Sequence, residues 1–108
     1  MLNANLTGSY QIAVVLIPKQ EFIDWVNILT EKGLFSKESL ESSVYLFPEL
    51  KTVGEIEEAI KAGLWVTLFD NELLDWTDEA ILLPKTKSYQ MFCEWLEVKM
   101  CTNVFQVA

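Results

Sequence analysis

The spacing of apolar residues changes abruptly at Pro18, and this change constrains the fold more than any other feature. The longest apolar run, residues 12–17, has the length of a buried strand and is far shorter than the roughly 20 residues that span a bilayer. Beyond Pro18, apolar residues recur at three- and four-residue spacing, which is typical of an amphipathic helix. They are Phe22, Trp25, Val26 and Leu29. The pattern therefore predicts a strand, then a helix over 19–32 that Gly33 ends in a left-handed turn.

Two further strands are expected. Residues Ser43–Phe47 alternate and are rich in β-formers, and Pro48 stops them. Residues 98–107 form the last strand. If the first helix crosses over the sheet, the first two strands are parallel, and the last strand can join either of them. The sheet is therefore mixed or antiparallel.

Three helices are expected between the second and third strands. Thr52 and Glu55 form a capping box that begins one helix, and Gly63 breaks it. Residues 64–76 have β-formers at their start, so a strand is an alternative there. However, Trp65, Leu68, Phe69 and Leu73 recur at helical spacing beyond the β-like part, which favours a helix. Ser88 is placed to cap the last helix.

Together these segments predict an α+β domain with the order β-α-β-α-α-α-β. Its three-stranded sheet is packed by helices on one face. The 108 residues suffice for one domain. We expect residues 1–108 to form that domain, with residues 1–10 as a loosely attached arm.

The charged residues exclude several kinds of chemistry. The chain has no histidine and no arginine, and 16 acidic residues face 8 lysines, for a formal net charge of −8. Without histidine, the Ser-His-Asp and Cys-His mechanisms are excluded, and the composition argues against an enzyme. Without arginine, an acidic chain repels phosphate backbones, so we expect no nucleic-acid partner. No Gly-rich phosphate loop or metal-ligand motif is present, so we expect no cofactor.

The two cysteines, Cys93 and Cys101, stand eight residues apart and form no CxxC motif. No signal-peptide pattern precedes the first strand. We therefore expect a cytoplasmic protein that does not enter a membrane, with both cysteines as reduced thiols.

One short basic segment is a candidate anion site. Lys85, Lys87 and Ser88 stand just before the last helix, where the helix dipole favours negative charge. The alternative interpretation is an ordinary solvated helix cap.

A second candidate is an interface at Trp76, Asp78 and Glu79. Trp76 stands where a helix gives way to a loop, and a half-exposed tryptophan there can anchor a partner. The acidic residues around it do not match a calcium loop and are expected to be a solvated helix end. They are Asp70, Glu72, Asp75, Asp78 and Glu79.

The second half of the chain also carries a longer pattern. Trp76-Thr77-Asp78-Glu79 is followed by Leu83-Pro84, by residues 91–98 with the sequence MFCEWLEV, and by Val104-Phe105. This series, with the strand-Pro-acid element of residues 44–49, resembles a family of small bacterial proteins of unknown function. The resemblance covers residues 43–107. It implies a bacterial origin and carries over no activity, ligand or catalytic residue.

From the sequence we expect a protein that acts by contact with a partner whose surface is basic or apolar, as an adaptor, inhibitor or regulatory subunit. The alternative is a small-ligand or anion-binding domain near the start of the last helix. The chain is expected to be a monomer or a homodimer formed by edge-strand pairing.

Overall fold

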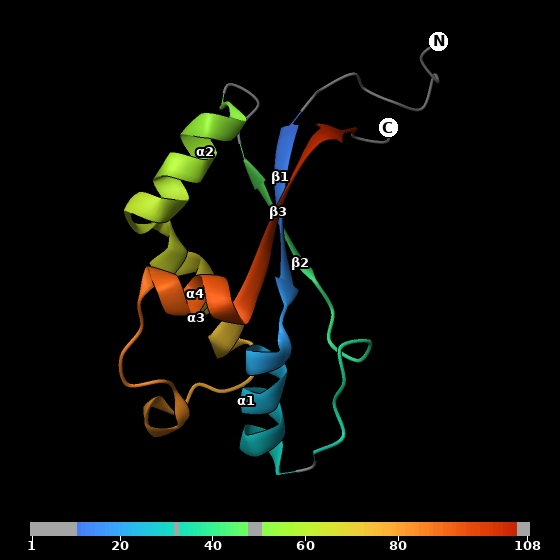
Figure 1. Ribbon diagram of the computed structural model, residues 1–108, viewed down its shortest axis with the longest axis vertical. Coiled ribbons are helices and arrows are strands. Elements are labelled where there is room, and N and C mark those ends of the chain that lie inside the picture. The colour runs from blue at the N-terminus through green and yellow to red at the C-terminus, as the bar shows by residue number, and fades with distance from the viewer. Residues whose placement is uncertain (1–10, 32, 48–50, 106–108) are drawn as a thin grey trace.

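A three-stranded antiparallel sheet with the order β2-β1-β3 organises the structure. The computed structural model describes residues 11–31, 33–47 and 51–105 (Figure 1). The elements follow one another as β1 (Gln11–Pro18), α1 (Gln20–Thr30), β2 (Ser43–Phe47), α2 (Val53–Ala59), the π-helical turn η1 (Ile60–Leu64), α3 (Trp65–Leu74), the 3-10 turn η2 (Ala80–Leu82), α4 (Tyr89–Trp95) and β3 (Leu96–Val104). The predicted α+β class and the order β-α-β-α-α-α-β are confirmed.

The first two strands are antiparallel, so the parallel pairing left open by the sequence is wrong. Helix α1 does not cross back over the sheet. It continues beyond the end of β1, and the chain then returns along the sheet as β2 (Figure 1). A parallel pair needs a connection that crosses the sheet, and this one does not. Strand β3 joins the other side of β1, which makes β1 the central strand.

The helix expected over 19–32 is shorter than predicted. It ends at Thr30 because Glu31 itself adopts the left-handed conformation, with φ of 58°. The Glu31 N–H bonds the carbonyl of Ile28 at 3.3 Å, which closes the last turn before Gly33 is reached. The prediction that Gly33 ends the helix is therefore wrong, although Gly33 also has a positive φ.

The later elements follow the sequence signals closely. The Thr52 hydroxyl accepts the N–H of Glu55 at 3.1 Å, and the Ser88 hydroxyl accepts that of Met91 at the same distance. Residues Trp65–Leu74 are helical, as their spacing indicates. Strand β3 begins at Leu96, earlier than predicted, because Leu96 is already extended and pairs with Pro18. The arm predicted at residues 1–10, and the end of the strand predicted over 98–107, lie outside the described residues.

The two faces of the sheet differ in what covers them. Val14 and Leu16 of β1 point to the helices and are fully buried, while α2, α3 and α4 lie together on that side (Figure 1). On the opposite face, Val44 and Leu46 of β2 are 59% and 61% exposed. The sheet therefore has one packed face and one face with exposed apolar side chains.

Aromatic rings join α1, α3 and α4 in the core. Phe69 and Phe92 are fully buried, with ring centroids 5.8 Å apart and nearly edge to face. Trp25, Trp65 and Trp95 pack against this cluster and remain half-buried. Large indole rings are rarely covered completely in a small protein. No described helix has the length and apolar character needed to cross a membrane.

We predict that Phe92→Ala lowers the free energy of unfolding by about 3–5 kcal/mol, because it leaves a cavity among the core rings. Urea unfolding followed by tryptophan fluorescence measures the change. Val66→Ala is the control, since Val66 is 40% exposed and its truncation should change stability by less than about 0.5 kcal/mol. Similar losses in both variants would contradict the assignment of Phe92 to the centre of the core.

Candidate functional site

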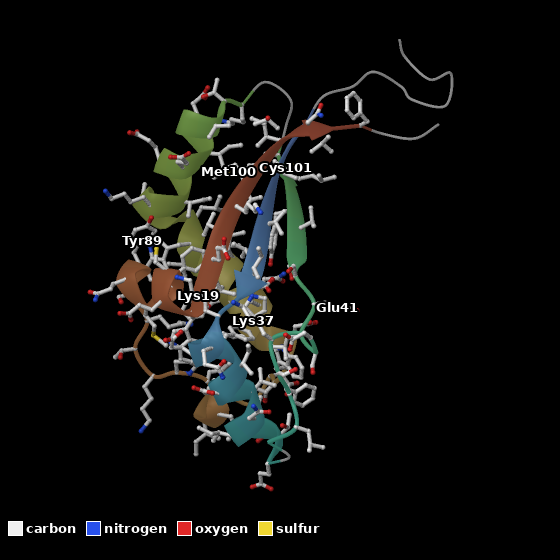
Figure 2. All side chains as sticks on the ribbon, turned by 45° about the vertical axis from the view of Figure 1, so that its right-hand side comes forward. Lys19, Lys37, Glu41, Tyr89, Met100 and Cys101 are labelled. Carbon is white, nitrogen blue, oxygen red and sulfur yellow. The ribbon has the colours of Figure 1, made fainter. Side chains whose placement is uncertain are left out.

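A groove runs beside β3, between this strand and the helices α2 and α4. It encloses about 540 Å³. Strand β3 contributes Leu96, Glu97, Val98 and Met100, and the helical side contributes Glu57, Glu58, Ile60, Lys61, Tyr89 and Cys93, with Lys19 completing the lining. In Figure 2, Met100 lies on β3, Lys19 lies near the lower end of this strand, and Tyr89 lies on the side of the helices. We call this feature the β3 groove.

The β3 groove lies along an unpaired strand edge. Within the described part of the chain, β3 pairs with β1 alone. An edge strand points the N–H and C=O groups of alternate residues away from its sheet. The Leu96 N–H bonds the Phe92 carbonyl of α4. Beyond Leu96, the backbone groups of residues 97–104 bond no described backbone group outside the sheet. The groove is therefore bordered by backbone groups that can receive another strand.

The floor of the β3 groove is apolar and its rim is charged. Ile60 and Leu96 are buried beneath it, and Val98 and Met100 are half-buried. The rim carries exposed carboxylates and ammonium groups on α2, η1 and β3. They are Glu57, Glu58, Glu97 and Lys61. A groove of this kind can hold an apolar side chain while its rim attracts a cation.

Two polar contacts fix the end of the β3 groove near α4. The ammonium group of Lys19 donates to the backbone carbonyl of Cys93 at 2.7 Å, so this lysine ties the end of β1 to α4. The backbone N–H of Lys19 also donates to the Trp95 carbonyl, at 2.8 Å. Beside these contacts, interaction with the Cys93 side chain raises the pKa of Tyr89. Cys93 is half-buried, Cys101 is exposed, and both are unpaired thiols.

A second groove, of about 590 Å³, lies beside the other edge strand, β2. It is lined by residues of β2 and of the η1–α3 segment: Tyr45, Leu46, Phe47, Leu64, Thr67, Leu68, Asp70, Asn71 and Leu74. Here side chains already join the strand to the helix. The Asn71 amide donates to the Tyr45 hydroxyl at 2.9 Å, and Tyr45 in turn donates to Glu72.

Glu72 is a buried carboxylate that the sequence analysis missed. It is only 7% exposed and accepts hydrogen bonds from the hydroxyls of Ser43, at 2.9 Å, and Tyr45. It was grouped with the solvated acidic helix end, and for Glu72 that prediction is wrong. The sequence does contain a signal of this burial, because Glu72 falls on the same helical stripe as Phe69 and Leu73. A charged residue on an apolar stripe indicates a buried partner.

Two of the three residues of the predicted anion site, Lys87 and Ser88, are used in other contacts. Lys87 forms an ion pair with Asp70 of α3. The Ser88 hydroxyl caps α4 by accepting the N–H of Met91. Lys85 is exposed, and neither groove described above is lined by Lys85, Lys87 or Ser88. The structure thus gives these three residues no common target, and the anion site stays a prediction.

The residues of the predicted interface lie at the C-terminal end of α3. Trp76 is half-buried, and its ring meets that of Phe35 edge to face, with centroids 5.4 Å apart. Asp78 and Glu79 are exposed. An aromatic ring therefore lies close in sequence to two carboxylates, as expected. However, the Trp76 ring is partly covered by Phe35 and offers a partner less surface than a free ring would. The interface at this corner also stays a prediction.

Among the described residues, no group of three or more acidic or cysteine side chains is arranged to hold a metal ion. The sequence matches no protein-family model, no curated protein and no solved structure. The resemblance to a bacterial family therefore stays a prediction.

We predict that Tyr45 makes stability fall with rising pH in the alkaline range. Burial, and next the hydrogen bond to Glu72, raises the pKa of Tyr45 to about 12. In the unfolded chain a tyrosine ionises near pH 10, so between these values the unfolded chain loses a proton that the folded chain keeps. The free energy of unfolding should therefore decrease from about pH 10 to about pH 12.

Urea unfolding of the wild type and of Tyr45→Phe, measured from about pH 8 upward, checks this linkage. The variant should be less stable near neutral pH, because Glu72 loses a donor. Its stability should then fall less steeply than that of the wild type above about pH 10. Equal slopes in the two proteins would show that Tyr45 is not held in its protonated form by the fold.

Proposed function

We propose that this protein acts by binding another protein, as an adaptor, inhibitor or regulatory subunit, and that the β3 groove is its binding surface. The observation that carries the proposal is the combination of an unpaired strand edge with an adjoining apolar groove and a charged rim. Edges of this kind are templates for pairing with another chain, and natural proteins usually block them. Here the carboxylates of the rim add attraction for a basic partner surface.

The β3 groove supports binding better than the groove beside β2. Strand β3 is the longer edge, with 9 residues against 5 in β2. On the β2 side, Ser43 and Tyr45 are already bonded to Glu72 of α3. A partner entering there would have to break buried hydrogen bonds, whereas the β3 edge requires no such loss.

We also propose a bacterial, cytoplasmic protein. The unpaired state of Cys93 and Cys101 supports a reducing compartment, because such compartments keep thiols free. The bacterial origin is supported by the resemblance of residues 43–107 alone.

The binding proposal predicts that charge reversal at the groove rim weakens capture of a stoichiometric companion from an extract of the source cells. Glu57→Lys combined with Glu58→Lys changes two exposed residues of α2, so the fold should be kept. The captured amount of the companion should fall at least about tenfold, which corresponds to about 1.4 kcal/mol. Quantitative mass spectrometry of the captured proteins measures it.

The matched control is Asp78→Lys combined with Glu79→Lys, which makes the same charge change beside Trp76. Capture should stay at the wild-type level in this control. A loss in the control with none in the groove variant would move the interface to the Trp76 corner. No companion, or equal losses in both variants, would contradict binding through the β3 groove.

A further inference from the structure

We infer that the β3 groove takes an extended peptide segment in which basic and apolar residues alternate, and that this segment adds to the sheet as a fourth strand beside β3. This inference rests on the proposed function and names the kind of partner that the groove accepts. The partner contributes one segment of extended chain, and its backbone bonds the outer groups of β3 beyond Leu96, to which the described residues offer no second strand.

The position of the groove fits an added strand. Neighbouring strands lie about 4.8 Å apart, so a fourth strand beside Leu96–Met100 would lie along the groove. Alternate side chains of a strand point to opposite faces. Every second side chain of the segment would therefore turn toward the helices, above Ile60 and beside Val98 and Met100, where the lining is apolar.

The remaining side chains of the segment determine its charge. They would lie on the open face of the sheet, next to Glu97 and Lys99 of β3. Glu57 and Glu58 of α2 lie on the helix side of the groove, so they favour basic side chains on this segment through their negative field and not by direct contact. The groove lining carries three carboxylates, Glu57, Glu58 and Glu97, against the two ammonium groups of Lys19 and Lys61, so it is acidic by one charge. With a net charge of −8 on the whole chain, basic residues of the segment are favoured over acidic ones.

Two other occupants fit the groove less well. A second copy of this chain would bring its own β3 and the same carboxylates, because a twofold interface places identical surfaces together. Two chains of charge −8 also repel each other. A helical ligand has a diameter of about 10 Å and suits a broad groove between helices. Its backbone groups are already bonded within the helix, so it cannot bond the edge of β3.

Peptides of about seven residues, in which lysine and valine alternate, test the inference directly. Two N-methylated forms are compared, one methylated at the odd positions and the other at the even positions. In an added strand only one set of N–H groups faces β3. One form should therefore bind like the parent peptide, and the other should bind at least about tenfold more weakly, since two or three hydrogen bonds are lost. Nuclear magnetic resonance titration of the labelled protein gives the affinities and the residues involved.

The amide signals that shift should be those of residues Leu96–Met100 and of the groove lining. A peptide with glutamate in place of lysine should bind at least about tenfold more weakly. Glu57→Lys with Glu58→Lys should reduce or reverse this preference, and Asp78→Lys with Glu79→Lys should leave it unchanged. Equal binding of the two methylated forms, equal binding of the acidic and basic peptides, or shifts away from β3 would each overturn the inference.

Sedimentation of the wild type without peptide completes the test. If the protein is a dimer that the peptide does not dissociate, and the amide signals of β3 do not shift on titration, a second copy occupies this edge. That result also overturns the inference. The proposed function fails separately. If the peptides do not bind but companion capture still depends on Glu57 and Glu58, only the extended basic segment is refuted. If companion capture is independent of the groove rim, the proposed function itself is refuted.

Discussion

The pairing of β1 with two antiparallel neighbours is the constraint on which the rest of the structure depends. It joins segments from opposite ends of the described chain, since β1 spans Gln11–Pro18 and β3 spans Leu96–Val104. It also places Val14 and Leu16 under the helices, where they are fully buried. A three-stranded sheet with β1 in the centre necessarily has two edges, and these are β2 and β3. Which of the two edges can bind another chain depends on the contacts that its strand already makes with the helices.

The two edge strands differ in the hydrogen bonds that join them to the helices. On the β2 side, the buried carboxylate of Glu72 accepts hydrogen bonds from Ser43 and Tyr45 and so joins the strand to α3. A buried carboxylate needs such donors, and losing one would leave it unsatisfied. On the β3 side, the polar contacts lie at one end of the strand, where Lys19 donates to the Cys93 and Trp95 carbonyls and the Leu96 N–H bonds the Phe92 carbonyl. Val98 and Met100 line the β3 groove, and among the described residues β3 pairs with β1 alone, so this part of the edge can receive another chain.

Much of the fold could be predicted from local signals. The change of spacing at Pro18, the capping residues Thr52 and Ser88, and the helical spacing of residues 64–76 depend on neighbours in sequence, and each signal was interpreted correctly. The direction of β2 could not be predicted, because it depends on where α1 leads the chain. The end of α1 was misplaced for a related reason, since Glu31 takes a conformation that usually favours glycine.

The site was harder to predict than the fold because its parts are distant in sequence. Glu57 and Glu97 line one groove only after α2 and β3 have packed on the sheet. Lys87 appeared available for an anion, but the fold brings Asp70 to it. Glu72 is a different case: it was predicted to be solvated, although its place on an apolar helical stripe is a local signal of burial. Spacing along one helix can be interpreted locally, whereas pairing between elements requires the tertiary structure.

Amide hydrogen exchange along β3 in the free protein tests the central claim most directly, because it asks whether the outer edge of this strand is open. If it is, protection should alternate from Glu97 to Met100, since the Leu96 N–H already bonds the Phe92 carbonyl and is protected in either case. Amides bonded to β1 should exchange slowly, and those pointing into the groove should exchange at least about a hundredfold faster. Uniformly slow exchange along the strand would show that the outer edge is already paired, and would contradict the account.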